Sequence, residues 1–598
     1  MQSPLTAVSP RPRQGSEADE ESSTRIRVTP RAVEKPRRAS LPILTSNAPQ
    51  RLSLTPEEHR QLEKGFENGF RYLPIELFKT EHGFYVFDAR NVCFLEVEQV
   101  AFDMLAILRE RNASLDEIIS LLPQHKEEDV RDAYQDFLDS QANDLLVNYE
   151  FQRLPRHQNS EYEEVLSQKM GGFTIFITTR CNLGCSYCIY GGQYEQHEEL
   201  TQMPMPWETV KATMDFLERH SRKSEKVRLD FFGGEPLLAF NMIDRGVQYL
   251  KSIIKPGGPC VEITITSNGT VITDRILDFL LEHNVYLQFS IDGDRNSHDL
   301  HRRYKTSDRG SFDVILRNLQ KIYDRSPDYF RQNMRMKGVL TNEGVDSDDW
   351  EFFNHPLIKI IIDAGHFTFL NLEPNYDLAK DDEYFKGIHS LGQKLLGMKG
   401  LGTEQDILAA LNIKQKSLYQ HTLARFFEAQ AINQVYFGGM DSTPFTKGCL
   451  TGYQEGAVNT NGDISICLKS AKGKNFVIGN VNEGRWYYEK MMELNTRFHA
   501  DWAGCSSCFV QKMCELCYEK LNGEEGKWVA GRSKFCEFNR QRYRVIFDYM
   551  LRTMENNPAL WEDLERIIKE KIALQAAESQ TDADQYGSRN LFTEPETN

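Results

Sequence analysis

The sequence lacks any hydrophobic run long enough to cross a membrane. Its longest apolar stretches, such as LIKIIIDAG at 357–365, are far shorter than the roughly 20 residues that a transmembrane helix needs. Residues 1–50 contain no apolar signal-peptide core, and they mix Arg and Lys with Glu and Asp, which fits a transit peptide poorly. We therefore expect a cytoplasmic protein without a membrane partner.

The chain also lacks an excess of positive charge. It has 71 Lys and Arg residues against 87 Asp and Glu residues, which gives a formal net charge of -16. Proteins that bind nucleic acids usually carry a basic patch or stripe. We therefore expect no nucleic-acid partner.

The length and composition predict several globular domains behind a disordered tail. The chain has 598 residues, and domains average about 100 to 200 residues. Hydrophobic residues make up 40% and charged residues 26% of the chain, as is usual for globular proteins. Residues 1–50 are rich in Ser, Pro, Arg and Glu and poor in large apolar residues, so we expect them to be disordered.

The twelve cysteines lie mostly in two groups. Three are found at 181–188 and seven at 449–536, which leaves only Cys93 and Cys260 outside the groups. In a reducing cytosol, clustered cysteines bind metal more often than they form disulfides. We expect the two isolated cysteines to be small buried hydrophobic residues.

A small α+β module is predicted at 51–155. Short aromatic and β-branched runs at 75–80, 83–88 and 91–97 predict three strands. Helical spacing follows, and Ser114 with Glu117 matches a capping box. Three strands followed by three helices resemble a winged-helix module, although composition alone leaves open a role in stability only.

Strands and helices then alternate along 165–375, which predicts a parallel sheet, open or closed as a barrel. The active sites of such folds lie at the carboxyl ends of the strands. Motifs with polar or reactive residues follow four of the expected strands, namely the three cysteines, GGEP at 233–236, SNG at 267–269 and SIDG at 290–293. We expect these motifs to meet at one edge of the sheet.

The first cysteine group has the spacing Cys181-x-x-x-Cys185-x-x-Cys188, with no fourth cysteine beside it. A structural zinc site normally has four protein ligands, whereas an iron–sulfur cubane held by three thiolates keeps one iron open. With Tyr187 before the last cysteine and GGEP after the second strand, this segment resembles the radical S-adenosylmethionine (SAM) enzymes.

This resemblance implies a partial (β/α)6 barrel whose open iron binds SAM and yields a 5'-deoxyadenosyl radical. The cofactor supplies the chemistry, and the protein positions and shields it. The implied electron donor is a flavodoxin or ferredoxin. The residues implied in SAM binding are Gly233, Gly234 and Glu235 through their backbone, Ser290, Asp292 and Arg302 near the ribose and carboxylate, and Tyr187 near the adenine. A polar strand end that is merely solvated remains the alternative for the last four.

The second group contains two Cys-x-x-Cys pairs, which alone would be typical of a zinc ribbon. All seven together resemble the SPASM extension, which implies two auxiliary [4Fe-4S] clusters. The implied ligands are Cys449, Cys467 and Cys517 for the first cluster and Cys505, Cys508, Cys514 and Cys536 for the second. The last pair is spaced by two residues where three are usual, and an eighth cysteine found in sulfatase maturases is absent. The first auxiliary cluster is therefore expected to have an open iron.

The module at 51–155 resembles the PqqD-like RiPP recognition element, which binds the leader of a precursor peptide. An exposed edge strand can pair with an extended peptide through main-chain hydrogen bonds, so we expect residues 72–150 to bind the leader. The expected domains after it are the radical SAM core at 165–375, a helical bridge at 376–440, the SPASM domain at 441–545, and a helix with a frayed tail at 546–598.

Together these features predict an enzyme that matures a ribosomally made peptide. Thioether formation between a cysteine sulfur and a carbon is the favoured reaction, followed by a carbon–carbon cyclophane link and then by epimerisation. A sulfatase maturase that makes formylglycine is a further alternative, as is a zinc-stabilised binding protein.

Overall fold

The computed structural model describes most of residues 73–371, 382–422 and 456–570 together with 442–444. The gaps within these ranges are 144, 148–151, 155–162, 164–165, 192–202, 342–349, 471–473, 501–507, 515–517, 519–533, 561, 565 and 568–569. The predicted tail at 1–50 and three predicted cluster ligands, Cys449, Cys505 and Cys517, lie outside the described residues.

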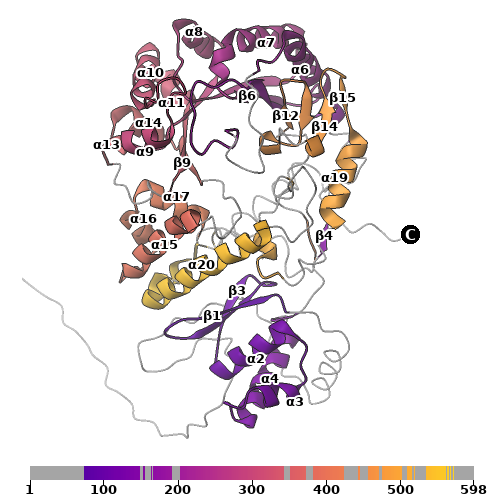
Figure 1. The fold of residues 1–598 in the computed structure, drawn as a ribbon, viewed down its shortest axis with the longest axis vertical. Helices are drawn as coiled ribbons and strands as arrows, with labels where there is room; N and C mark the ends of the chain where they lie inside the picture. The colour runs from indigo at the N-terminus through magenta and orange to yellow at the C-terminus, as the bar shows by residue number, and fades with distance from the viewer. Residues whose placement is uncertain are drawn as a thin grey trace, which may run out of the picture.

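A ten-stranded sheet forms the largest body of the molecule (Figure 1). Six of its strands are parallel and neighbour one another in chain order, as the alternation of strands and helices predicts. They are β5 (Gly172–Thr178), β6 (Lys226–Gly233), β7 (Cys260–Ser267), β8 (Tyr286–Ser290), β9 (Met334–Leu340) and β10 (Phe367–Asn371).

The other four strands come from the cysteine-rich region and extend this sheet beyond β5. Strand β12 (Gly456–Val458) pairs in parallel with β5, although about half of the chain separates them. Antiparallel partners follow through tight turns at Gly462 and Gly484, where the φ angles of 92° and 69° favour glycine. These strands are β13 (Asp463–Ser465), β14 (Val477–Asn480) and β15 (Arg485–Trp486).

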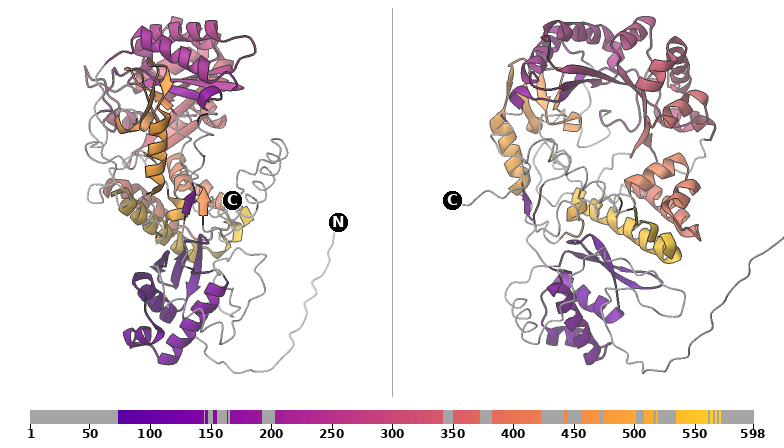
Figure 2. Two further views of the ribbon diagram at one scale, coloured as in Figure 1. Left: turned by 90° about the vertical axis from the view of Figure 1, so that its right-hand side faces the viewer. Right: turned by 180° about the vertical axis from the view of Figure 1, so that it is seen from behind.

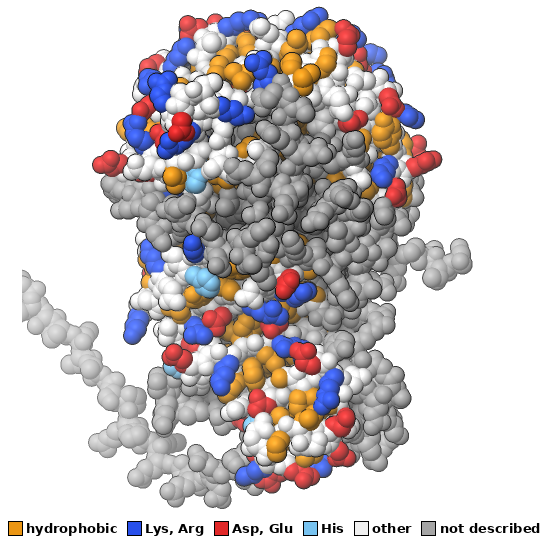
Figure 3. Space-filling view, in the orientation of Figure 1, with side chains coloured by type: hydrophobic (Ala, Val, Ile, Leu, Met, Phe, Trp, Pro, Cys, Tyr) orange, Lys and Arg blue, Asp and Glu red, His pale blue; other side chains and the backbone are white. Residues whose placement is uncertain are grey.

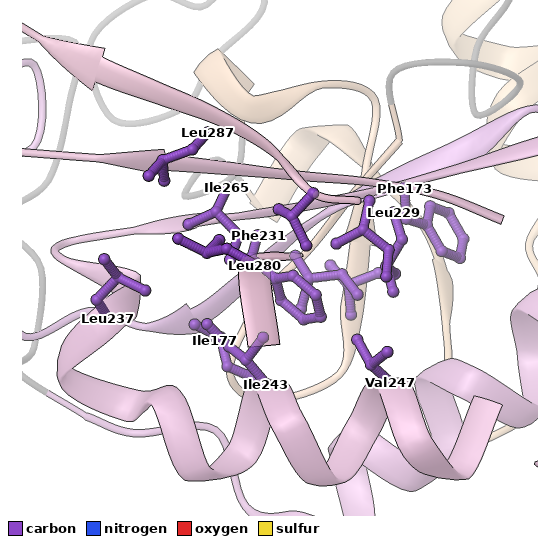
Figure 4. Close-up of a cluster of buried hydrophobic side chains, with 14 of the residues drawn as sticks. Phe173, Ile177, Leu229, Phe231, Leu237, Ile243, Val247, Ile265, Leu280 and Leu287 are labelled. Carbon is purple, nitrogen blue, oxygen red and sulfur yellow. The ribbon is translucent and has the colours of Figure 1, made fainter. Parts of the chain in front are cut away.

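Helices cover the outer face of the parallel strands (Figures 1 and 2). Side chains alternate along each strand, so Leu229 and Phe231 of β6 point toward Ile243 and Val247 of the neighbouring helix α7 (Figure 4). The elements between the strands are α6 (Trp207–His220), the 3-10 turn η1 (Pro236–Ala239), α7 (Phe240–Ile253), α8 (Asp274–Glu282), α9 (Arg295–His301), α10 (Phe312–Arg325), α11 (Pro327–Asn333), α13 (Trp350–Phe353) and α14 (Pro356–Asp363).

The N-terminal module has the predicted order of three strands and three helices. Its antiparallel sheet runs β1-β2-β3, and the predicted capping box of Ser114 and Glu117 starts the second helix. Val97 ends the third strand, as the run at 91–97 predicts. The elements are β1 (Ile75–Lys79), β2 (Phe84–Asp88), β3 (Cys93–Val97), α2 (Gln99–Glu110), α3 (Leu115–Leu121) and α4 (Glu127–Ala142).

A helical layer separates this module from the large sheet (Figure 1). Its long helix α20 packs along α15, and it runs continuously across the predicted domain boundary at 545. Among the described residues, no helix has the length and hydropathy needed to cross a membrane. The layer contains α15 (Asp382–Gly397), α16 (Glu404–Ala410), α17 (Ile413–His421) and α20 (Lys534–Asn556).

The remaining elements are short or lie at the margins of these bodies. Strand β4 pairs in parallel with β11, which joins the segment after the N-terminal module to the cysteine-rich region. These elements are β4 (Gln152–Leu154), β11 (Ser442–Pro444), η3 (Leu468–Ser470), η4 (Lys474–Phe476), α19 (Tyr488–Ala500) and η6 (Gln511–Met513).

Of the two isolated cysteines, only one has the predicted environment. Cys93 is buried in the core of the N-terminal module. The prediction for Cys260 is wrong, because this residue begins β7 at the amino end of the strand and its side chain is exposed.

On the face drawn in Figure 3, Lys and Arg side chains alternate with Asp and Glu over the described surface.

Candidate active site at the carboxyl ends of the parallel strands

The first three cysteines occupy a loop that directly follows β5. The amide of Cys188 donates to the carbonyl of Cys185 at 3.1 Å, which closes a tight turn around the last thiol. The amides of Gly184 and Ser186 donate to the carbonyls of Arg303 and His301, at 2.9 and 3.2 Å. The loop is therefore held by its own turn, by the end of α9 and by the segment that follows this helix.

The thiols of Cys181 and Cys185 interact electrostatically with each other and with Cys188. Burial raises the pKa of Cys185 to about 12; Arg302 opposes this shift, whereas Cys188 and Cys181 add to it. Burial also raises the pKa of Cys181, and the amide nitrogen Nδ2 of Asn268 donates to its sulfur at 3.9 Å. Thiols in this environment become thiolates when a cationic centre replaces their protons.

Each of these three thiols could bind a different iron of a cubane. Among the described residues, no group of three or more His, Cys, Asp and Glu side chains is arranged to hold one metal ion. In an iron–sulfur cubane each thiolate binds a different iron, so its ligands need not converge on one point. The three mutually interacting thiols after β5 fit such a group.

Two glycines let the end of β6 approach this loop closely. A Cβ atom on Gly233 would lie 2.0 Å from the carbonyl oxygen of Thr178, and one on Gly234 would lie 2.2 Å from that of Arg180. Their neighbouring amides bond to the same two carbonyls, at 2.9 Å from Gly234 and 2.7 Å from Glu235. Only glycine fits both positions, and the backbone role of this segment toward SAM stays a prediction.

The Glu235 side chain points into the protein. Its carboxylate accepts hydrogen bonds from the Leu237 amide at 3.0 Å, the Ser267 hydroxyl at 2.8 Å and the Asn268 amide at 2.7 Å. Burial raises its pKa to about 7, although these three donors oppose the shift. Glu235 thus joins the end of β6 to the SNG motif after β7.

Three of the predicted SAM contacts form a buried network with one another. Arg302 donates to the carboxylate of Asp292 through Nε at 2.8 Å and Nη2 at 3.1 Å, and the Tyr187 hydroxyl donates to the same carboxylate. The Arg302 guanidinium lies 5.3 Å from the centre of the Tyr187 ring. Ser290 ends β8 next to this network with a half-buried side chain.

Sequence reasoning missed two further residues at this edge. His298 of α9 is buried, accepts from the Asp292 amide at 3.4 Å and lies 2.9 Å from the Ser311 hydroxyl. Tyr190 packs with Phe176 and Phe232, and it donates to the Leu468 carbonyl at 2.8 Å. The spacing of HDLHR could have suggested a histidine near Arg302, but no local pattern predicts the contact of Tyr190 with a segment far along the chain.

Part of the second cysteine group also comes together. Burial, then Cys514 and more weakly Cys536, raise the pKa of Cys508 to about 11. These are three of the four ligands predicted for the second auxiliary cluster. Cys467 lies just before Leu468, the residue that Tyr190 contacts. The fold therefore places Cys467 close to the loop of the first group, whereas Cys508, Cys514 and Cys536 lie near one another.

Comparison with known proteins defines the class of this site. Residues 175–339 match the family described as the radical SAM superfamily. These residues therefore form a radical SAM domain, and this family implies SAM and a [4Fe-4S] cluster as cofactors.

Two curated proteins are similar to this chain. The chain is 20% identical, over 79% of its length and 93% of the relative, to the radical SAM cyclopropyl synthase TigE of Paramaledivibacter caminithermalis. It is 29% identical to a serine-type anaerobic sulfatase-maturating enzyme of Bacteroides thetaiotaomicron, over 24% of this chain and 34% of the relative.

Solved structures similar to this chain include that of anSMEcpe with bound AdoMet. It matches at a TM-score of 0.46 and 18% identity, over 68% of this chain and 98% of that chain. The same enzyme with AdoMet and the Cp18Cys peptide matches at a TM-score of 0.45 and 17% identity over 67% of this chain and 99% of that chain.

Proposed function

We propose that this chain is a radical SAM peptide maturase that installs thioether links in a ribosomally made precursor. The observation that carries the proposal is the combination of three thiols at the strand ends with three further thiols at Cys508, Cys514 and Cys536. In this proposal Cys181, Cys185 and Cys188 hold the cluster that binds SAM. The bound group would supply the radical that removes hydrogen from carbon.

The electron balance of this reaction requires a second redox group. Joining a thiol to a carbon removes two hydrogen atoms from the peptide, one of which goes to the deoxyadenosyl group. The other leaves as a proton and an electron, so an electron acceptor is needed. Auxiliary clusters on the second cysteine group belong to this class of acceptor, and a flavodoxin or ferredoxin is the proposed donor to the enzyme.

The N-terminal module is the proposed site of the leader peptide. One face of its sheet packs on α2, α3 and α4, and the other packs on α20. Glu76 on β1 binds Arg109 of α2 and Arg544 of α20, each at 3.1 Å. Charged side chains therefore crowd the edge of the sheet formed by β1. With both faces occupied, a peptide would have to bind along an edge, which supports pairing by strand addition.

Carbon–carbon bond formation is the second candidate, because the relative that covers most of this chain is a cyclopropyl synthase. A formylglycine-generating sulfatase maturase is a weaker alternative, since that similarity spans only 24% of the chain. The open iron predicted for the first auxiliary cluster favours thioether formation, because it would bind and deprotonate a substrate thiol.

The experiment is co-expression of the enzyme with a short precursor encoded beside its gene, followed by mass spectrometry with and without thiol alkylation. Thioether formation removes two hydrogen atoms per link and protects the linked cysteine from alkylation. A carbon–carbon link gives the same mass loss but leaves every cysteine reactive. The matched control is the enzyme with Cys181, Cys185 and Cys188 replaced by Ala, which must leave the peptide unchanged.

A further inference from the structure

The acceptor capacity of Asp292 is used up by the protein. Its carboxylate accepts from Tyr187, from two nitrogens of Arg302 and from the Val339 amide at 2.9 Å. A carboxylate offers about four acceptor positions, and Asp292 is only 3% exposed. A ribose hydroxyl would have to displace one of these donors, so the sequence-based role of Asp292 as a SAM contact conflicts with its hydrogen bonds.

The donors come from three separate segments of the site. Tyr187 belongs to the cysteine loop, Arg302 follows α9, and Val339 lies in β9. Asp292 itself directly follows β8, and its own amide is held by His298. One buried side chain therefore joins the cysteine loop to the ends of two neighbouring strands.

The network also sets the local charge beside Cys185. Burial would raise the pKa of Asp292, but the charge and hydrogen bonds of Arg302 hold it below its ordinary value. The charge of Arg302 lowers the pKa of the Cys185 thiol, and the charge of Asp292 raises it. Of the two charges, that of Arg302 has the larger effect on the thiol, and that of Asp292 offsets part of it.

We propose that Asp292 is a positioning residue that fixes Tyr187 and Arg302 against the cysteine loop and neutralises Arg302 beside the Cys185 ligand. This inference rests on the proposed cluster at Cys181, Cys185 and Cys188. It predicts a signed effect, because an extra positive charge near a cluster stabilises the form that carries one more electron. Removing the Asp292 charge alone should therefore make the cluster easier to reduce.

The test is a redox titration of the anaerobically reconstituted full chain, monitored by electron paramagnetic resonance. The spectrum of the Cys181→Ala, Cys185→Ala, Cys188→Ala variant is subtracted to remove the auxiliary signals. Asp292→Asn should shift the midpoint potential of the remaining signal to a more positive value. The double variant Asp292→Asn with Arg302→Gln restores a neutral pair and should return the midpoint toward that of the wild type.

Two further variants separate charge from shape. Asp313→Asn is the matched control, because Asp313 also forms a two-bond pair with an arginine, Arg295, but with both side chains at least half exposed. It should leave the midpoint unchanged. Tyr187→Phe removes one donor without changing charge, and it should alter the line shape of the signal with no comparable midpoint shift.

The outcomes are distinguishable. A wild-type chain whose spectrum equals that of the triple cysteine variant overturns the proposed cluster site and this inference with it. A wild-type chain with its own signal, together with an unshifted midpoint in Asp292→Asn, overturns this inference alone. If Asp292→Asn does not fold, an unchanged line shape in Tyr187→Phe overturns the positioning role.

Discussion

At the scale of single residues, the two buried carboxylates of the site organise the backbone around it. Glu235 accepts three hydrogen bonds and Asp292 accepts four, all from protein donors. Each donor set joins the ends of neighbouring strands. Buried polar groups of this kind are costly unless every partner is present, so these residues keep the loops at the sheet edge in one arrangement.

Glu235 makes stability depend on pH in a direction that is unusual for a carboxyl group. Its pKa is about 7 in the folded chain against an ordinary 4.5, so between these pH values the unfolded chain releases a proton that the folded chain retains. The free energy of unfolding should therefore fall as pH rises through this window, by about 3 kcal/mol.

Glu235→Gln should remove this dependence. The urea midpoint of unfolding is measured for the variant and for the wild type at pH 5 and at pH 7.5. The midpoint of the variant minus that of the wild type should be larger at pH 7.5 than at pH 5. The comparison is between chains at each pH, which cancels any effect of acid on a bound cluster. A constant difference between the two chains would show that Glu235 is ionised in both states throughout.

Gly234 provides a steric prediction. The Cβ atom of Gly234→Ala would lie 2.2 Å from the oxygen and 2.5 Å from the carbon of the Arg180 carbonyl, which forces the end of β6 away from the cysteine loop. Formation of 5'-deoxyadenosine with dithionite should fall at least tenfold, about 1.4 kcal/mol. Gly397→Ala is the control, because no atom lies within 4 Å of its Cβ position. Equal losses in both variants would contradict the steric argument.

At the scale of elements, local pattern predicted most of the strands but few of the contacts between distant segments. The runs FTIFITT at 173–179 and VEITITS at 261–267 predict strands through their β-branched and aromatic residues, and strands begin and end within one residue of these bounds. The short helices α9 and α11 were missed, since seven residues are too few for a clear helical period. The pairing of β12 with β5 depends on residues more than 270 positions apart, and no local signal encodes it.

The same limit applies to the candidate site. The cysteine spacing and the glycines were readable because each has a local chemical or steric reason. The network around Asp292 was not readable, because Tyr187, Arg302 and Val339 become neighbours only when the strands align. A motif thus predicted which residues gather at the edge but not which of them use one another as partners.

Tyr190 gives a prediction at this scale, because it joins the cysteine loop to the segment that carries Cys467. Tyr190→Phe leaves the packing with Phe176 but deprives the Leu468 carbonyl of its donor, which should cost about 1 kcal/mol. Tyr190→Ala also leaves a cavity, and should cost about 3 to 5 kcal/mol.

Thermal unfolding and the 5'-deoxyadenosine assay measure these effects. Tyr190→Phe should retain most SAM cleavage, whereas Tyr190→Ala should lose much of it. Tyr249→Phe is the control, since its hydroxyl likewise makes a hydrogen bond, to Asp215 at 2.6 Å, but on the outer helices. A loss of SAM cleavage in that control would mean that the assay reports global stability alone.

At the scale of the whole molecule, the N-terminal module is built into the rest of the chain. Phe87 of β2 packs against Phe509 and Phe547, with ring centres 6.3 and 4.8 Å apart. Phe509 lies between Cys508 and Cys514, and Lys512 of the same segment donates to the Arg90 carbonyl. The module therefore covers the segment that carries two of the predicted ligands of the second auxiliary cluster.

Deleting residues 1–150 should consequently do more than remove a peptide-binding module. Loss of β2 and β3 uncovers Phe509 and Phe547, whose burial contributes about 1.5 to 3 kcal/mol per side chain. In the part of the chain that the structure describes, the core between the large sheet and its helices contains no residue of the module, so SAM cleavage should persist.

The quantity that the deletion should change is the iron bound at sites other than Cys181, Cys185 and Cys188. In chains that also carry Cys181→Ala, Cys185→Ala and Cys188→Ala, the deletion should lower the iron bound per chain, whereas deletion of residues 1–50 alone should not. Iron content after anaerobic reconstitution and gel filtration measures both. An unchanged iron content in the long deletion would contradict this prediction. It would mean that the residues after 500 bind the second auxiliary cluster without contact from the β1-β2-β3 sheet.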